Sequence, residues 1–218
     1  MAGQNHTGMP TEITPSGPEG VAFGEPVWPA PRRLLASGGM AVDHVFQGPV
    51  CVLIPVTAPE DAEVGSSLDL RFDVEWMACE IMCETGRVEP SLTVPVLAEA
   101  PEPDAGVAEV FAATRRRVPE AVPSTERVVL VERTVNGATI RARGAPRLAF
   151  YPDGQGTRIG SLVETGIAEG DMLRLKFAED RDPAEPLMLS GVLEVFSHDG
   201  RSRVYRVRTA PETTTTNG

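Results

Sequence analysis

Hydrophobic and polar residues alternate most regularly in the segment LDLRFDVEW, residues 68–76. Every second position is apolar, and the positions between them are charged. A period of two is typical of a β-strand that buries one face and leaves the other in water. The apolar positions are Leu68, Leu70, Phe72, Val74 and Trp76. The segment is therefore predicted to be a half-buried strand with one wet face.

Two neighbouring segments carry further strand patterns. PVCVLIPVTAP, residues 49–59, is apolar at both alternating sets of positions, which predicts a central strand covered on both sides. In RVEPSLTVPV, residues 87–96, the alternation resumes, and Pro90 and Pro95 predict an edge strand or irregular pairing because proline has no N–H to donate. The first half thus reads as strand, turn with two cysteines, strand.

One segment has a convincing helical pattern, DAGVAEVFAATRRRVP, residues 104–119. Asp104 is a suitable N-cap, and Pro119 follows the expected end. The positions at helical spacing are Val107, Val110, Phe111 and Thr114. We predict a single short helix that joins two strand-rich halves.

The second half predicts several short strands joined by tight turns. Asn136-Gly137 fits the two positive-φ positions of a hairpin in residues 128–142, and Asp199-Gly200 marks a second hairpin in residues 191–207. DMLRLKF, residues 171–177, alternates as a strand does. Strands at this spacing indicate a sandwich more than a barrel.

Composition agrees with an all-β fold, because 21 Gly and 20 Pro among 218 residues favour turns over long helices. Residues 1–20 are rich in Pro, Gly, Thr and Ser and are predicted to be a flexible leader, and residues 210–218 a flexible tail. Between them we expect a first β-rich domain, residues 21–120, and a second β-rich segment, residues 124–209.

The net charge of −11 argues against nucleic-acid binding, which needs clustered basic residues. The one basic cluster, Arg115 to Arg117, is too short to change this. No run approaches the roughly 18 apolar residues of a transmembrane helix, and no secretory signal is visible. We expect no membrane span in this chain.

Cys79 and Cys83 lie four residues apart, directly after the alternating strand. An extended chain would separate them by about 13 Å, too far for a disulfide, so the segment must curl if they bond. A loop of about five residues gains roughly 2 kcal/mol from such a bond, against nearly 4 for the loop of about 29 that Cys51–Cys79 would close. A local structural disulfide, two buried thiols and a redox pair remain open at this point.

Charge and soft ligands bear on these alternatives. Glu75, Glu80 and Glu84 should raise the pKa of nearby thiols and slow attack by the reduced form, unless a partner supplies the attacking thiolate. A Cu(I) site is a third reading, since thiolates and thioethers suit that ion. Its candidate ligands are Met77, Cys79, Met82 and Cys83. Zinc is disfavoured because no CxxC pair or suitably spaced His is present.

In order and spacing, four segments resemble a known family. They are FGEPVWPAPRRL, PVCVLIPVTAP, LDLRFDVEWMACEIMCETG and FAATRRRVP. Together they are similar to the N-terminal periplasmic domain of the DsbD/ScsB-type thiol:disulfide interchange proteins, over about residues 21–120. The ScsB type, linked to copper tolerance, is the nearer likeness. CETG replaces the proline-containing turn usual after the second cysteine, and no membrane electron-carrying or thioredoxin-like domain is present in this chain.

The resemblance implies an immunoglobulin-like β-sandwich in the periplasm. It makes Cys79 and Cys83 the redox pair and places Cys51 in a buried strand, where core packing is the preferred role. Family members shield the pair with a cap loop, and the matching stretch is LLASGGMAVDHVF, residues 34–46. Met40 or Phe46 would then cover the sulfurs. Asp43 or His44 would assist proton movement, although each is expected to be an ordinary surface residue.

The function implied is a thiol:disulfide exchange module, a component of a protein-disulfide reductase. It would relay reducing equivalents from a thioredoxin-like protein or domain, with a membrane electron-transfer partner, to other exported thiol proteins. No organic cofactor is needed. The alternative is a Cu(I)-binding or protein-binding sandwich in which the cysteine pair is structural.

Overall fold

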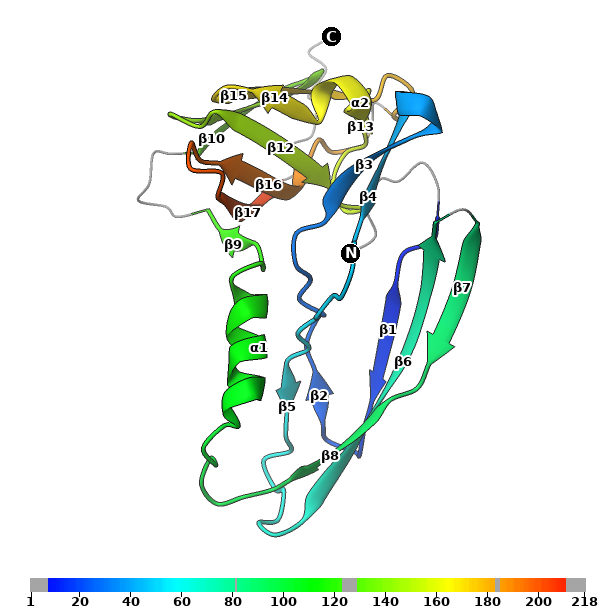
Figure 1. The fold of residues 1–218 in the computed structure, drawn as a ribbon, viewed down its shortest axis with the longest axis vertical. Coiled ribbons are helices and arrows are strands. Elements are labelled where there is room, and N and C mark those ends of the chain that lie inside the picture. Colours follow the sequence, from blue (N-terminus) through cyan, green and yellow to red (C-terminus); the bar gives the residue numbers. More distant parts are fainter. Residues whose placement is uncertain (1–7, 81, 123–128, 183–184, 211–218) are drawn as a thin grey trace. The chain divides into compact units, whose positions relative to one another are not determined.

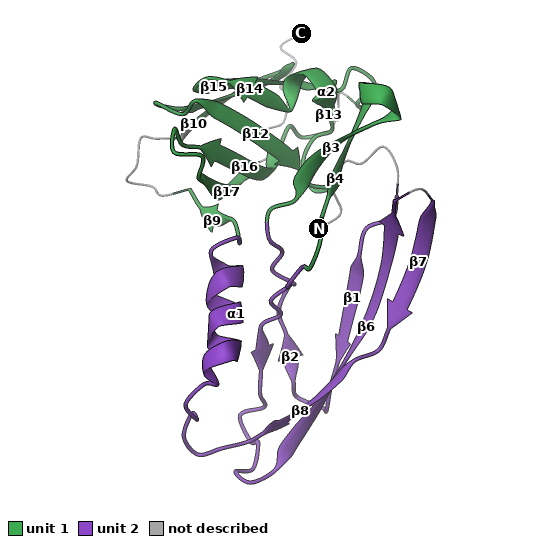
Figure 2. Ribbon diagram, in the orientation of Figure 1, with its two compact units in different colours: residues 1–7, 30–49, 118–218 green, residues 8–29, 50–117 purple. Residues whose placement is uncertain are grey.

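The computed structural model describes residues 8–80, 82–122, 129–182 and 185–210. Strands hold 47% of the residues and helices 9%, which confirms the all-β prediction with one short connecting helix. The chain forms two interleaved units (Figure 2). Unit 1 consists of residues 1–7, 30–49 and 118–218, and unit 2 of residues 8–29 and 50–117. Residues 30–49, inside the predicted domain 21–120, therefore belong to unit 1.

Unit 2 is built around one long strand (Figure 1). Its elements are β1 (Glu12–Ser16), β2 (Ala22–Phe23), β5 (Val56–Thr57), β6 (Ser67–Cys79), β7 (Cys83–Val88), β8 (Ser91–Pro95) and α1 (Ala105–Arg115). β6 pairs with β1 along one edge, and with β8 and then β7 along the other, all antiparallel. The break between β7 and β8 falls at Glu89 and Pro90, as the proline pattern predicts.

The predicted two-faced character of β6 is confirmed. Leu70 is buried, and Phe72 is half-buried with its ring edge-to-face against Phe23, the ring centroids 6.3 Å apart. On the other face, Asp69 and Arg71 are exposed. This face of the sheet, which also carries the side chains of Asp73, Glu75, Met77 and Cys79, is called the wet face below.

The prediction of a flexible leader over residues 1–20 is wrong for residues 12–16, because β1 pairs with β6 from Glu12↔Glu75 to Ser16↔Arg71. Pro15 is tolerated because β1 is an edge strand. Residues 1–7 and the predicted tail, apart from Ala210, lie outside the described residues.

The prediction of a central strand at residues 50–56 is also wrong. Leu53 makes an isolated bridge with Val27, and β5 pairs only with β2. Pro49 and Pro55 interrupt the run, and their missing N–H groups prevent a continuous ladder. Cys51 is consequently an exposed free thiol and not a core residue.

The predicted helix is confirmed as α1, with Asp104 accepting a hydrogen bond from the N–H of Val107 at its N-terminus. Only Thr114 of its periodic positions is buried, and its hydroxyl donates to the carbonyl of Val110. The apolar side chains Val107, Val110 and Phe111 are exposed.

Unit 1 has two larger sheets (Figure 1), which share an apolar core, and one two-stranded sheet. Its elements are β3 (Arg32–Ala36), η1 (Ser37–Gly39), β4 (Ala41–Val45), β9 (Glu120–Ala121), β10 (Val129–Thr134), β11 (Gly137–Ala142), β12 (Arg147–Pro152), β13 (Ile159–Gly160), α2 (Leu162–Thr165), β14 (Ile167–Glu169), β15 (Met172–Phe177), β16 (Ser190–Phe196) and β17 (Ser202–Arg208). The larger sheets have the orders β10-β11-β15-β13 and β14-β12-β16-β17-β9, and the two-stranded sheet pairs β3 with β4.

The core of unit 1 forms where alternating apolar positions of both sheets meet. Ile140 and Leu173 contribute from one sheet, and Leu148, Phe150 and Leu193 from the other, all almost fully buried. The predicted strand 171–177 is confirmed as β15, and the hairpin around Asp199-Gly200 as β16–β17. The burial of apolar side chains between these two sheets stabilises the unit.

The hairpin predicted at Asn136-Gly137 exists as β10–β11, but its two loop residues are Val135 and Asn136. Gly137 starts β11 and pairs with Thr134. A Cβ atom at Gly137 would lie 2.1 Å from the carbonyl oxygen of Leu175 on β15. The glycine is therefore needed for close approach to the neighbouring strand and not for the turn.

Candidate functional site

The cysteine pair closes the tip of the β6–β7 hairpin. Cys79 and Cys83 are the last paired positions of the ladder, their Cα atoms are 4.1 Å apart, and they form a disulfide. Next to the cysteines, the N–H of Glu80 donates to the carbonyl of Met82. Both cysteines are exposed. The disulfide is thus a link between facing positions of two strands, open to solvent.

The sulfurs lie on the wet face of the sheet. Side chains alternate along a strand, so Cys79 points to the same side as Met77 and Glu75. Directly paired positions share a face, which puts Cys83, Thr85 and Arg87 there as well. The disulfide therefore lies at the end of the polar face of the sheet and not in the apolar layer on the other side of β6.

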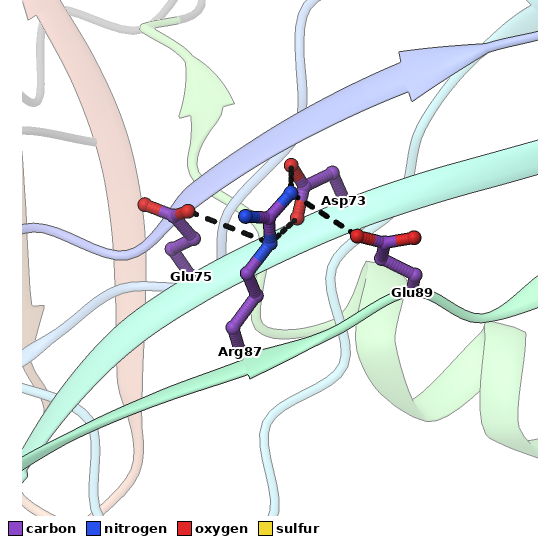
Figure 3. A network of polar contacts seen from close by, with 4 residues as sticks. All are labelled: Asp73, Glu75, Arg87 and Glu89. Carbon is purple, nitrogen blue, oxygen red and sulfur yellow. Dashed lines mark hydrogen bonds and ion pairs between the residues drawn. The ribbon is translucent and has the colours of Figure 1, made fainter.

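A network of charges lies on the wet face (Figure 3). Arg87 donates from Nε and Nη2 to the two carboxylate oxygens of Asp73, at 2.8 and 2.7 Å. It also forms ion pairs with Glu89 at 3.1 Å and with Glu75 at 3.6 Å. The hydrogen bonds to Asp73 and the three negative charges raise the pKa of Arg87. One guanidinium is shared by three carboxylates, so the network keeps a net negative charge.

This network spans both strands of the hairpin, because Arg87 sits directly opposite Glu75 and reaches diagonally to Asp73. Such cross-strand pairs oppose slippage of one strand against the other. Glu12 on β1 is paired with Glu75 and adds a further carboxylate to the face. Sequence reasoning missed Glu12 and Arg87, since it assigned residue 12 to a leader and spacing alone did not give the register.

The opposite face of the hairpin is held by Trp76 and Gly86, which are paired across the ladder. A Cβ atom at Gly86 would lie 2.3 Å from the indole ring of Trp76. The ring therefore lies over the glycine backbone, an arrangement that only glycine permits. This packing holds β6 and β7 together at a position three residues from each cysteine.

The four residues predicted to cap or assist the disulfide belong to unit 1, whereas the cysteines belong to unit 2. Met40 follows η1 and is 82% exposed. The ring of His44 on β4 packs edge-to-face on Tyr151 of β12, with centroids 5.4 Å apart. Phe46 follows β4 and is half-buried. Their role as a cap stays a prediction.

Asp43 is not the ordinary surface residue that the sequence predicted, because only 5% of it is exposed. It lies in the middle of β4, whose first three residues are all buried. The hairpin partner β3 carries Arg33, which donates to the carbonyls of Leu162 and Val163 in α2 at 3.2 and 2.7 Å. The β3–β4 hairpin is thereby fastened within unit 1.

Unit 1 also holds a hydrogen-bonded group that the sequence gave no reason to expect. The Tyr151 hydroxyl donates to Oε2 of Glu194, and the Ser202 hydroxyl donates to Oε1 of the same carboxylate, both at 2.6 Å. Burial, followed by the bond to Glu194, raises the pKa of Tyr151. The three residues come from separate strands, so no local motif marks them.

Two of the four ligands of the Cu(I) hypothesis lie beside the disulfide. Met77 lies on the wet face with Cys79, and Met82 is 73% exposed at the hairpin tip. With the disulfide formed, neither cysteine has a thiolate to offer. Within the described ranges, no three His, Cys, Asp or Glu residues are grouped as a metal site.

Among the described residues, no helix has the length and apolar character needed to cross a membrane. A cleft of about 640 Å³ in unit 1, lined by residues that include Thr157, Glu185 and Arg208, contains none of the predicted site residues.

In the comparisons with known proteins, no family model, curated protein or solved structure matches this chain.

Proposed function

We propose that the chain is a thiol:disulfide exchange module that relays reducing equivalents through Cys79 and Cys83. The observation that carries the proposal is the position of the disulfide: both cysteines are exposed at a hairpin tip on the wet face. An incoming thiolate needs an unobstructed approach to a disulfide sulfur, and this surface provides it within unit 2.

The short loop supports exchange over a purely structural role. A five-residue loop gains only about 2 kcal/mol from cross-linking, and the strands at the tip are already held by the Arg87 network and by Trp76 on Gly86. The hairpin can therefore keep its shape when the bond opens. A redox pair benefits from such a frame, because the two thiols stay opposite each other for reoxidation.

The proposed reaction has two steps. A partner thiolate attacks the sulfur of one cysteine, the Cys79–Cys83 bond breaks, and the other cysteine leaves as a thiolate that takes a proton from water. A second partner thiolate then attacks the partner's sulfur in the mixed disulfide. The first cysteine leaves as a thiolate that also takes a proton from water, so the pair ends as two thiols and the partner, which has given up two electrons and two protons, ends as a disulfide.

The donor in this proposal is a thioredoxin-like protein or domain, with a membrane electron-transfer partner behind it, and the acceptors are exported thiol proteins. The resemblance over residues 21–120 supports these partners and a periplasmic location. A periplasmic setting also fits the chemistry, since oxidising compartments preserve exposed disulfides that the cytosol would reduce.

The test is a redox titration of the full chain, followed by alkylation of free thiols and mass spectrometry. The Cys51→Ser background removes the exposed third thiol. We expect one reversible two-electron transition of Cys79 and Cys83, and Cys83→Ser should accumulate a mixed disulfide at Cys79. A bond that resists strong reductant, or thiols that do not reoxidise, would show that the pair is a staple.

The second candidate is a Cu(I)-binding or protein-binding module. The shared face of Met77 and Cys79 and the exposure of Met82 favour it over other metal readings. It requires the reduced pair. Cu(I) uptake by the reduced chain that is lost in Cys79→Ser and weakened in Met77→Leu would favour this candidate over exchange.

A further inference from the structure

We propose that the Cys79–Cys83 disulfide selects thiol partners that carry positive charge beside their reacting sulfur, with Glu80 and Glu84 as the residues that determine this preference. The inference rests on the proposed exchange function and adds the charge of the partner to it. Its basis is the distribution of charge around the exposed sulfurs.

Glu80 and Glu84 are the charged residues nearest to the cysteines along the chain. Each follows a cysteine directly in the chain, and both are exposed. Glu84 is paired with Ala78, so its side chain leaves β7 on the face opposite the sulfurs, and its carboxylate acts across the strand over a distance comparable to the Debye length, roughly 8 Å at physiological ionic strength. No basic residue lies between Val74 and Gly86 to offset them.

The Arg87 network contributes less to the field at the sulfurs. Glu75 lies four residues before Cys79, which corresponds to about 13 Å along a strand and exceeds the Debye length. The charge of Arg87 is also shared among Asp73, Glu75 and Glu89. The network extends the negative surface along the wet face, and Glu80 and Glu84 add the carboxylates that adjoin the cysteines in the chain.

This field acts on the thiolate that opens the bond. Because both cysteines are held in the disulfide, the nucleophile that opens the bond comes from the partner and enters this negative field. The field repels that incoming thiolate unless the partner has a cation nearby. The matching surface on a partner is an exposed thiol ringed by Lys or Arg, which adds electrostatic steering to the encounter.

The experiment measures the rate of disulfide opening in the full-length Cys51→Ser chain with three small thiols. Cysteamine is cationic, 2-mercaptoethanol neutral and 3-mercaptopropionate anionic, and each rate is expressed per concentration of thiolate. Comparison of the Glu80→Gln/Glu84→Gln variant with the unsubstituted pair cancels the intrinsic reactivity of each thiol. The Glu60→Gln/Glu99→Gln variant, which removes two exposed carboxylates away from the hairpin tip, is the matched control.

We expect the cysteamine-to-mercaptopropionate rate ratio to fall about three- to fourfold when Glu80 and Glu84 are neutralised at 0.15 M ionic strength, for carboxylates roughly one Debye length from the reacting sulfur. The difference should nearly vanish in 1 M salt, and the control should keep the original ratio. Unchanged tryptophan fluorescence checks that the hairpin is intact.

Two outcomes overturn the inference and differ in what they say about function. If all three thiols open the pair and the ratio is the same with and without Glu80 and Glu84, exchange stands and the charge preference is wrong. If neutral 2-mercaptoethanol does not open the pair reversibly, the proposed exchange function fails, and the charge preference fails with it.

Discussion

The two units bury their apolar residues to very different extents. In unit 1, two sheets enclose a core in which Phe150, Leu148 and Leu193 are almost fully buried. In unit 2, Leu70 is the one strongly buried aliphatic side chain among the described strands, and Leu92 is 56% exposed. Unit 1 is held by its core, whereas the disulfide-bearing hairpin of unit 2 is held by pairs across strands. The hairpin that carries the disulfide is thus in the less buried unit of the chain.

The aromatic residues of the chain allow the unfolding of each unit to be followed separately. Both tryptophans, Trp28 and Trp76, are in unit 2, and both tyrosines, Tyr151 and Tyr205, are in unit 1. Tryptophan fluorescence therefore follows unit 2, and the near-ultraviolet circular dichroism of tyrosine follows unit 1. The four predictions below use these signals.

The largest effect is expected in the core of unit 1. Phe150→Ala should lower the free energy of unfolding of that unit by about 3–5 kcal/mol, because it removes a ring that is 1% exposed and leaves a cavity. Leu92→Ala in unit 2 should change stability by less than about 0.5 kcal/mol. Urea titrations followed by the two signals test this, and equal losses would contradict the difference between the units.

Removal of the disulfide should affect unit 2 alone. Cys79→Ser/Cys83→Ser is expected to cost about 2 kcal/mol in the tryptophan-detected transition, the value for a loop of about five residues. The tyrosine-detected transition should not move. Cys51→Ser is the control, since it replaces an exposed thiol outside the bond. A loss in unit 1 would show that the bond supports more than the hairpin.

Tyr151 should make the stability of unit 1 depend on alkaline pH. The pKa of Tyr151 is raised in the folded state by burial and by its bond to Glu194, so the unfolded chain releases this proton first, near pH 10. Stability from this residue is present below pH 10 and is lost as pH rises, by at most about 1.4 kcal/mol per pH unit. Tyr151→Phe should flatten this dependence in denaturant titrations between pH 9 and 11. An unchanged slope would exclude Tyr151 as its source.

The smallest of the four effects is expected at Gly86. Gly86→Ala places a Cβ atom against the Trp76 ring, which is half-buried and able to shift. We expect a loss of about 1 kcal/mol in unit 2, at the low end for overpacking, together with a change in tryptophan emission. An unaltered emission spectrum would mean that the ring does not lie over this glycine in solution.

Local pattern predicted the elements whose sequence acts on its own neighbours. The alternation of residues 68–76 predicted β6, Asp104 predicted the start of α1, and Asp199-Gly200 predicted the β16–β17 hairpin. The segment at residues 50–56 failed because its apolar pattern is real but its prolines interrupt pairing. β1 was missed because an edge strand with a proline has no strong pattern of its own.

The sequence by itself determined the all-β class, the hairpin that carries Cys79 and Cys83, and the acidic residues beside them, because each follows from spacing and composition along the chain. Only the tertiary structure decided that the sulfurs are exposed on the wet face, that Arg87 is shared among three carboxylates, and that residues 30–49 join unit 1. These features depend on strand register and on contacts between residues far apart in sequence, and a side chain's exposure is set by what other segments place over it.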